Sequence, residues 1–241
     1  MKKYEAIECV MRDNGGTASW NIIYDNITKY YPTARSSKDW QEGIRGVLYR
    51  ELKKNNRFKR IGIGIYALGD YKEETQPAKN DKVRMHSLME GICIELGNMK
   101  KFYTYTADPS AMFRDNLRLS DIASMSELPE FSYDKILHEA RRIDVIWLNK
   151  KGLTFPQKVF EVVDSVGTMN GAFNRSLQLK SFMTEFFIVA PEKHHEKYLQ
   201  TIDLEAYQAQ KDRFTFINYD DMMDLYESAL RTNKLETKLF G

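Results

Sequence analysis

A polar stretch without hydrophobic periodicity divides the sequence into two unequal parts. Residues 70–82, DYKEETQPAKNDK, contain a proline and show neither helical nor strand periodicity. Such a segment offers no continuous apolar face to a hydrophobic core. We therefore expect two domains, residues 1–72 and 83–241, joined by a linker at residues 73–82.

The first part has the pattern of three helices followed by a β-hairpin. Asn14-Gly15-Gly16 ends the first helical segment, and Pro32 ends the second. In RFKRIGIGIYALGDY, isoleucines alternate with glycines, which predicts two short strands and a tight turn. Three helices and a hairpin are typical of a winged-helix domain. The helices are predicted at residues 3–13, 19–31 and 38–55.

Basic residues are concentrated in this first part. Residues 1–72 carry 14 Lys and Arg against 8 Asp and Glu, a balance of +6, whereas the rest carries 22 against 26, a balance of −4. A helix can enter the DNA major groove, which is about 12 Å wide, and a wing can follow the phosphates. The alternative is a charged, solvated surface. The expected DNA contacts are Arg45, Arg50, Lys53, Lys54, Arg57, Lys59 and Arg60.

The hairpin is the most specific part of this pattern. With a glycine-stopped first helix, a third helix and the ending F-K-R-I-G-I-G-I-Y-A-L, residues 1–72 resemble the HARE-type helix-turn-helix domain. The resemblance implies a module of DNA-linked proteins, restriction systems included. A winged helix used for protein contacts is the alternative.

The second part alternates helices with strands, which predicts an α/β (α+β) domain with a mixed sheet. Residues 107–130 contain two prolines and are expected to be irregular. Helices are predicted at 83–98, 133–139, 172–183, 192–199 and 220–232, and strands at 102–106, 142–148, 158–163, 185–190 and 213–217.

Two acidic residues lie in adjacent predicted strands. Asp144 lies in RRIDVIWL and Glu161 in KVFEVVDS, and a short turn at residues 149–152 separates the strands. Strands joined by so short a turn pair as neighbours, so the two carboxylates could meet at one end and hold Mg²⁺, which prefers oxygen ligands. A bound cation can activate water and neutralise charge on a phosphodiester. An acid with a purely structural role on a strand is the alternative.

The sequence around these acids resembles the PD-(D/E)XK nuclease superfamily. The stretch A-R-R-I-D-V-I-W-L is followed by F-E-V-V-D-S and an arginine-bearing helix, as in restriction-endonuclease-like proteins with R-I-D-V-I-W and F-E-V-E-D-S. Y-T-A-D-P-S and F-F-I-V-A-P also fit, so the resemblance covers about residues 83–200. It implies that Asp144 and Glu161 are catalytic and bind Mg²⁺, with Mn²⁺ as a possible substitute.

The third position of the motif departs from this pattern. The superfamily has lysine or glutamate two residues after the second acid, whereas this chain has Val163. Side chains alternate along a strand, so Val163 should share the face of Glu161, and Asp164 should point to the other face. An apolar group therefore takes the place of a group that manages protons or binds the metal.

The following helix contains candidates for a replacement. Gln178 or Lys180 could supply a migrated polar group, and we take Gln178 as the third catalytic candidate, although both could be plain surface residues. Arg175, near the start of this helix, could contact a DNA phosphate or serve in packing or a salt bridge.

Two functions remain open at this point. The first is a type II restriction-like endonuclease that cuts double-stranded DNA, with a possible homodimer because two strands require two catalytic domains. The second is a weakened or inactive nuclease relative that acts as a DNA-binding protein or regulator, since loss of acid–base assistance costs about 10²–10⁴-fold. The sequence specifies neither the recognition site nor the position of cleavage.

The remaining features concern the compartment. Cys9 and Cys93 lie far apart without metal-ligand spacing, which predicts free thiols in a reducing compartment, here the cytoplasm. No apolar run approaches the roughly 20 residues that span a bilayer. The beginning, MKKYEAIECV, lacks the apolar core of a signal peptide. We therefore expect no membrane contact.

Overall fold

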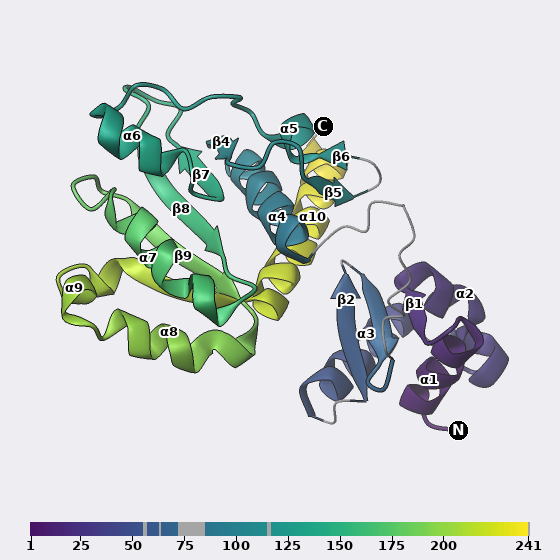
Figure 1. The fold of residues 1–241 in the computed structure, drawn as a ribbon. Coiled ribbons are helices and arrows are strands. Elements are labelled where there is room, and N and C mark those ends of the chain that lie inside the picture. Colours follow the sequence, from purple (N-terminus) through teal and green to yellow (C-terminus); the bar gives the residue numbers. More distant parts are fainter. Residues whose placement is uncertain (55–56, 63, 72–84, 115–116, 241) are drawn as a thin grey trace. The chain divides into compact units, whose positions relative to one another are not determined.

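The chain forms two compact units, residues 1–79 (unit 1) and 80–241 (unit 2) (Figure 1). The computed structural model describes residues 1–54, 57–62, 64–71, 85–114 and 117–240. The predicted linker at residues 73–82 lies outside the described residues. Each unit is described by itself.

Unit 1 combines three helices with a three-stranded antiparallel sheet in the strand order β1-β3-β2. Its core is formed by apolar side chains from all three helices and the sheet, among them Ile7, Ile27, Leu48 and Tyr66, each 0% exposed. The elements are α1 (Lys3–Asp13), β1 (Thr17–Ser19), α2 (Trp20–Tyr30), α3 (Trp40–Lys54), β2 (Phe58–Gly62) and β3 (Ile65–Leu68).

The turn after α1 explains why this helix ends where the sequence predicts. Gly15 and Gly16 have φ of +71° and +91°, a left-handed conformation that glycine adopts without a steric penalty. The chain then forms β1, which was not predicted because three residues are too few to show a period. Ser19 is not the first helical residue but the N-cap of α2, where its hydroxyl accepts a hydrogen bond from the Ile22 amide at 3.4 Å.

Unit 2 contains a five-stranded mixed sheet in the order β10-β9-β8-β7-β4. The β4, β7 and β8 strands pair antiparallel, whereas β8, β9 and β10 pair parallel. The predicted α/β (α+β) class and the pairing of the two acid-bearing strands are thus confirmed. The strands are β4 (Tyr103–Thr106), β7 (Val145–Leu148), β8 (Pro156–Val162), β9 (Glu185–Ala190) and β10 (Phe214–Asn218).

Helices cover both faces of this sheet (Figure 1). On one face the α7 side chain Phe173 stacks against Phe214 of β10, with ring centroids 4.6 Å apart. On the other face the Trp147 indole of β7 donates a hydrogen bond to the Cys93 carbonyl of α4 at 2.9 Å. The principal helices are α4 (Met85–Met99), α6 (Asp134–Ala140), α7 (Met169–Leu177), α8 (His195–Ile202) and α10 (Tyr219–Phe240).

A glycine lets α4 approach the sheet closely. A Cβ atom at Gly97 would lie 2.6 Å from both Thr104 Cγ2 and Trp147 Nε1, distances that real Cβ contacts do not reach. Only glycine therefore fits at this position without a shift of the helix. The beginning of α4 lies beside the start of β7 and the end of β8, where His86 is close to Asp144 and Asp164.

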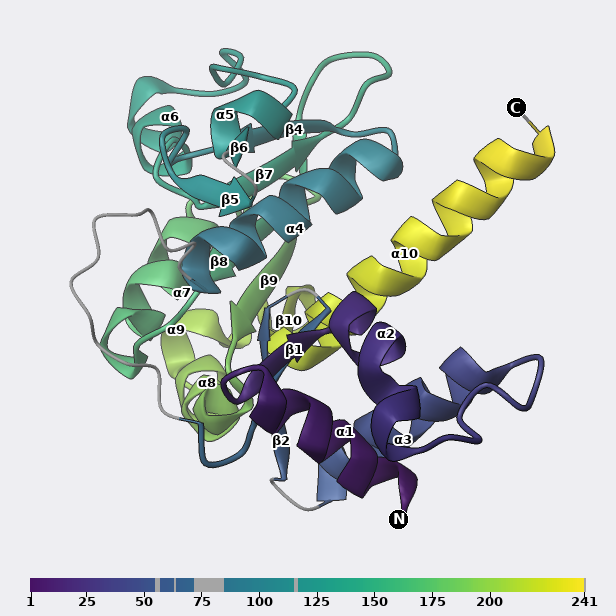
Figure 2. The same cartoon turned by 90° about the vertical axis from the view of Figure 1, so that its right-hand side faces the viewer.

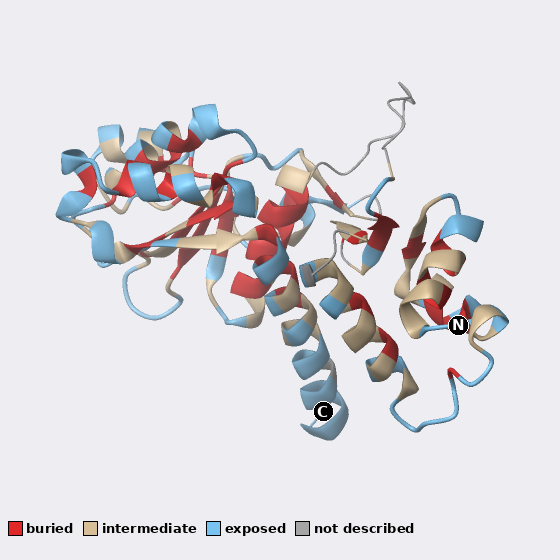
Figure 3. Ribbon diagram, turned by 90° about the horizontal axis from the view of Figure 1, so that it is seen from below, coloured by how far each residue is buried: buried red, intermediate tan, exposed pale blue. Residues whose placement is uncertain are grey.

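Three expectations for unit 2 were wrong in detail. The helix predicted at residues 172–183 is α7, which covers Met169–Leu177 and so begins and ends earlier than expected. Residues 107–130 are not wholly irregular, since they contain β5 (Met112–Arg114), β6 (Leu117–Arg118) and α5 (Leu119–Ile122), elements too short to show a period. The last helix, predicted to end at residue 232, continues to Phe240. Its final turns extend beyond the sheet (Figure 2), and Figure 3 shows them as exposed, so no buried apolar face marked them in the sequence.

None of the helices in the described ranges is both long and apolar enough to cross a membrane.

Candidate functional site

A pocket of about 220 Å³ opens in unit 2 beside the end of β8. It brings together the beginning of α4, the residue before β7, the residues after β8 and one side chain of α7. Acidic, basic and hydroxyl groups therefore converge where β7 begins and β8 ends. The lining residues are His86, Asp144, Val162, Val163, Asp164, Ser165, Thr168 and Arg175.

Asp144 comes directly before β7, where a neighbouring strand holds its carboxylate. In the β7–β8 pair Val145 lies opposite Phe160, so Asp144 lies opposite Glu161. Its Oδ2 atom accepts a hydrogen bond from the Val162 amide at 2.7 Å. Burial raises the pKa of Asp144 above its usual value, although this hydrogen bond opposes the rise. Asp144 and Glu161 therefore lie next to each other on paired strands, as the sequence predicts.

Glu161 is fully buried and bound to an arginine. Its Oε1 accepts from Arg175 Nε at 2.8 Å, and its Oε2 accepts from Arg175 Nη2. Burial raises the pKa of Glu161, whereas Arg175 favours its ionised form, and the Glu161 hydrogen bonds raise the pKa of Arg175. Of the roles considered for Arg175, the salt bridge is the one that this structure contains.

The side chains of Val163 and Asp164, directly after β8, point to opposite faces of the sheet, as the alternation along a strand predicts. Val163 is 1% exposed and shares a core cluster with Val159 and Phe173, on the α7 side of the sheet. Asp164 faces the opposite side, where its Oδ1 accepts a hydrogen bond from the Tyr219 hydroxyl of α10. Because β8 ends at Val162, Asp164 nevertheless borders the same pocket as Asp144.

Two residues of α4, His86 and Glu90, lie at or beside the pocket and were not predicted as site residues. His86 Nε2 lies 3.6 Å from Glu90 Oε1 and 3.9 Å from Asp144 Oδ2, and its Nδ1 lies 3.6 Å from Asp164 Oδ2. Glu90 is 1% exposed, one helical turn after His86. The signal was present in MHSLMEGICIEL, where a histidine and a glutamate four residues apart interrupt an apolar helix.

Opposite effects shift the pKa values of these two residues. Burial alone would lower the pKa of His86, but the carboxylates of Asp164 and Glu90 outweigh it and raise the pKa to about 10. Burial raises the pKa of Glu90 to about 7, and His86 opposes this rise. A group of strongly shifted acids and bases beside a pocket is typical of a functional site.

Gln178 is not brought to this pocket. It follows the last residue of α7, is exposed, and its amide donates a hydrogen bond to the Asn174 carbonyl at 3.2 Å. Lys180, the other replacement considered, is exposed as well. Neither residue lines the pocket that contains Asp144.

The basic residues of unit 1 that were expected to contact DNA differ in their surroundings. Arg50 and Lys53 of α3 are exposed, whereas the side chain of Lys54 lies outside the described part of the chain. The other four contact groups of their own unit. Arg45 Nε donates to the Tyr24 hydroxyl at 2.5 Å, Arg57 Nη1 to Glu8 at 2.9 Å, Lys59 Nζ to the Tyr71 carbonyl at 2.5 Å, and Arg60 Nη2 to the Tyr66 hydroxyl at 3.3 Å.

Comparison with known families identifies one match. Residues 67–238 match the model described as type II restriction enzyme NmeDI C-terminal domain. The matched range contains the whole pocket in unit 2, with His86, Asp144 and Arg175. No curated protein and no solved structure matches the chain.

Proposed function

Because this chain belongs to the family of the type II restriction enzyme NmeDI C-terminal domain, we propose that it is a restriction-type endonuclease that hydrolyses phosphodiester bonds of double-stranded DNA. The observation that carries the proposal is the position of Asp144, whose half-buried carboxylate is held by a backbone amide at the edge of an open pocket. A carboxylate fixed in this way is preorganised for a cation rather than for a mobile surface contact.

The acids beside this pocket fit a divalent cation. Besides Asp144, the buried Glu90 has an Oε2 atom without a hydrogen-bond partner among the described residues. Such an oxygen is costly to bury unless a ligand satisfies it. Mg²⁺ or Mn²⁺ bound at Asp144 would supply an activated water and neutralise the charge that develops on the phosphodiester. Glu161, the second acid expected to bind metal, accepts hydrogen bonds from Arg175 at both oxygens and would share them between Arg175 and the cation.

Arg175 is the residue best placed to contact a DNA phosphate. Its Nε and Nη2 atoms donate to Glu161, which leaves the Nη1 hydrogens available to an anion in the pocket that it lines. A guanidinium held by a buried carboxylate keeps a defined orientation towards that anion. In this arrangement Glu161 positions Arg175, and Arg175 binds the phosphate.

We further propose that unit 1 is a HARE-type winged-helix domain that directs unit 2 to DNA. Its α1-β1-α2-α3-β2-β3 order supports a winged helix. Arg50 and Lys53 are exposed on α3 and would contact the DNA, whereas the four basic residues with partners inside the unit would chiefly stabilise it. Two copies of the chain, each cutting one strand, would form a homodimer on the duplex.

One observation favours the second function, an inactive relative that binds DNA as a regulator. Val163 is an apolar, buried side chain at the position where the PD-(D/E)XK pattern has a lysine or glutamate. Without a group of this kind, proton transfer in the pocket would lose assistance worth about 10²–10⁴-fold.

The decisive experiment is cleavage of unmethylated plasmid and phage DNA by the purified chain with Mg²⁺ or Mn²⁺. Asp144→Asn should reduce cleavage at least about 10³-fold, the scale of losing several kcal/mol of transition-state stabilisation. The matched control is Asp203→Asn, which removes an exposed acid paired with Lys211 in the same unit. Salt-dependent DNA binding without cleavage under any of these conditions would favour the regulator.

A further inference from the structure

A cluster of three side chains from α4 and the edge of β7 has the composition of a metal site. We propose that His86, Glu90 and Asp144 together bind one divalent transition-metal ion, with Mn²⁺ preferred over Mg²⁺. The inference deepens the proposed function, because Asp144 belongs to both, and it assigns two ligands to a helix outside the acid-bearing strands.

The spacing of the ligand atoms supports this assignment. One nitrogen of His86 and one carboxylate oxygen each of Glu90 and Asp144 lie within 4.8 Å of one another. Neighbouring ligands of an octahedral ion with bonds of about 2.1 Å lie about 3 Å apart. The separations of 3.6 Å and 3.9 Å from His86 Nε2 are therefore within reach of small side-chain rotations.

The unsatisfied oxygen of Glu90 is an independent indication of a ligand. Glu90 is buried among the apolar side chains of α4, and its Oε2 atom lacks a hydrogen-bond partner among the residues that the structure describes. A buried carboxylate oxygen left without a partner carries the full cost of its desolvation. The other oxygen, Oε1, lies 3.6 Å from His86 Nε2, so a cation bound by both oxygens of this carboxylate would remove that cost.

The orientation of His86 also suits a metal ligand. Its Nδ1 faces the Asp164 carboxylate at 3.6 Å, and Asp164 is itself held by the Tyr219 hydroxyl. A carboxylate on one ring nitrogen fixes the tautomer and leaves the other nitrogen for the metal, an arrangement common to metal-binding histidines. Here Nε2 is the atom that points towards Glu90 and Asp144.

The donor set determines which metal fits. The imidazole nitrogen favours transition-metal ions over Mg²⁺ and Ca²⁺, which prefer oxygen ligands, and the two carboxylates are ligands that suit Mn²⁺. Glu161 is not among the three residues whose ligand atoms lie together, and both of its oxygens accept hydrogen bonds from Arg175.

The test measures Mn²⁺ binding by the full chain without DNA, by isothermal titration and by the electron paramagnetic resonance of free Mn²⁺. One ion should bind per chain, more tightly than Mg²⁺. His86→Asn, Glu90→Gln and Asp144→Asn should each weaken Mn²⁺ binding at least tenfold, on the scale of about 10–100-fold known for lost metal-site interactions. Asp164→Asn should weaken it less.

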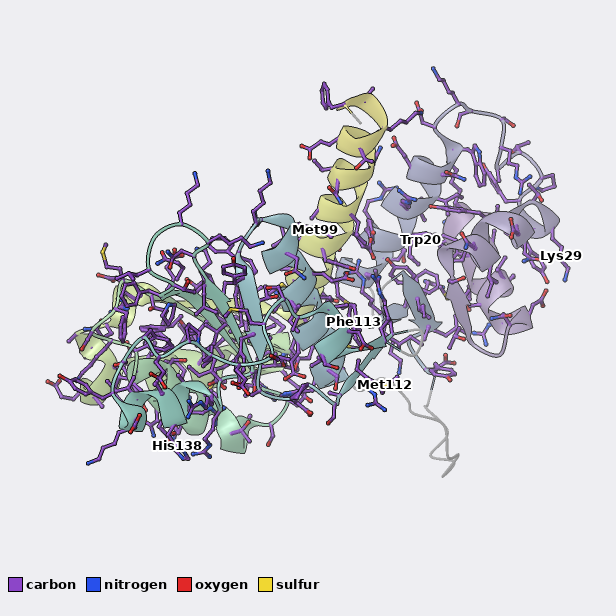
Figure 4. The ribbon with its side chains drawn as sticks, turned by 90° about the horizontal axis from the view of Figure 1, so that it is seen from above. Trp20, Lys29, Met99, Met112, Phe113 and His138 are labelled. Atoms are coloured by element: carbon purple, nitrogen blue, oxygen red, sulfur yellow. The ribbon has the colours of Figure 1, made fainter. Side chains whose placement is uncertain are left out.

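Two control variants are matched to these. His138→Asn replaces a histidine that is 73% exposed on α6 (Figure 4), and Asp203→Asn replaces an exposed acid paired with Lys211. Both should bind Mn²⁺ as the unmodified chain does. Circular dichroism identifies any variant that fails to fold, and broadening of the His86 ring resonances by Mn²⁺ in the unmodified chain provides a readout that needs no variant.

The possible outcomes separate this inference from the proposed function. Absence of Mn²⁺ binding, or binding unaffected by His86→Asn and Glu90→Gln in folded protein, would overturn the site and leave the cluster as a salt-bridge network around a protonated histidine. Mn²⁺ binding with the expected losses, but without DNA cleavage, would support the site and overturn the nuclease. Cleavage that requires Asp144 and tolerates His86→Asn would retain the nuclease alone.

Discussion

Glu8 and Asp13 of unit 1 are partly or largely exposed beside basic side chains, whereas in unit 2 Glu90 and Glu161 are buried and Asp144 is half-buried. Hydrogen bonds from Arg12 lower the pKa of Glu8, and a hydrogen bond from Lys29 lowers that of Asp13. In unit 2 burial instead raises the pKa values of Glu90 and Asp144. The same residue type is thus stabilised as an anion in one unit and destabilised in the other.

This contrast separates structural from functional charges. Exposed ion pairs contribute little net stability because water and salt already solvate both charges. Buried acids reduce stability unless they are paired, so their presence at a pocket is better explained by chemistry than by folding. The charges of unit 1 are therefore those of an ordinary charged surface, and unit 2 contains the acids that we assign to the proposed reaction.

The largest effect on stability should come from breaking the buried pair in unit 2. Arg175→Ala would leave Glu161 without a partner in the core and should reduce the free energy of unfolding of unit 2 by about 3–5 kcal/mol. Calorimetric and urea-induced unfolding of the full chain would measure this. Replacement of both partners, Arg175→Met with Glu161→Leu, should recover much of the loss. A loss below about 1 kcal/mol in Arg175→Ala would contradict an ionised pair.

The second prediction concerns the basic residues of unit 1. Arg50→Ala and Lys53→Ala should each weaken DNA binding and reduce the slope of log affinity against log salt concentration by about 1, since each would remove one phosphate contact. Fluorescence anisotropy at several salt concentrations would measure the slope. Lys29→Ala, outside α3 and paired with Asp13, is the control and should leave it unchanged. Equal slopes in all three variants would exclude α3 as the DNA-binding helix.

The smallest effect should come from the surface pairs of unit 1 and should depend on pH. The folded-state pKa of Glu8 is lowered, so its stabilising contribution is present above its ordinary value of 4.5 and is lost as the pH falls through the lower folded value. Glu8→Gln should remove this dependence and cost at most about 1 kcal/mol at neutral pH, because water screens the pair.

Amide hydrogen exchange of α1 in the full chain, measured between pH 7 and pH 3, would follow this contribution. Intrinsic exchange rates must be corrected at each pH, and Glu196→Gln in unit 2 provides a variant of similar chemistry. Stability of α1 that rises as the pH falls below 4.5 would reverse the expected sign and contradict the assigned pair.

Much of the fold follows from local patterns in the chain. The apolar spacing of residues 3–13 predicts α1 with its bounds, and the two glycines after it predict its end, because both effects depend only on neighbouring residues. The short turn at residues 149–152 likewise predicts the pairing of β7 with β8. The positions of β1, β5 and β6 do not follow, because strands of two or three residues are defined by their partners and not by a period.

The candidate site likewise combines residues that local patterns predict with residues that only long-range packing brings together. Asp144 and Glu161 could be found from two strands and one turn, because residues at facing register positions on adjacent strands must meet. His86 and Glu90 belong to a helix about 55 residues earlier in the chain, and the packing of α4 against β7 and β8 brings them to Asp144. Whether Glu161 faces a metal or Arg175 depends equally on contacts between distant segments. Local rules specify which residues each element presents, and long-range packing specifies which of them share a pocket.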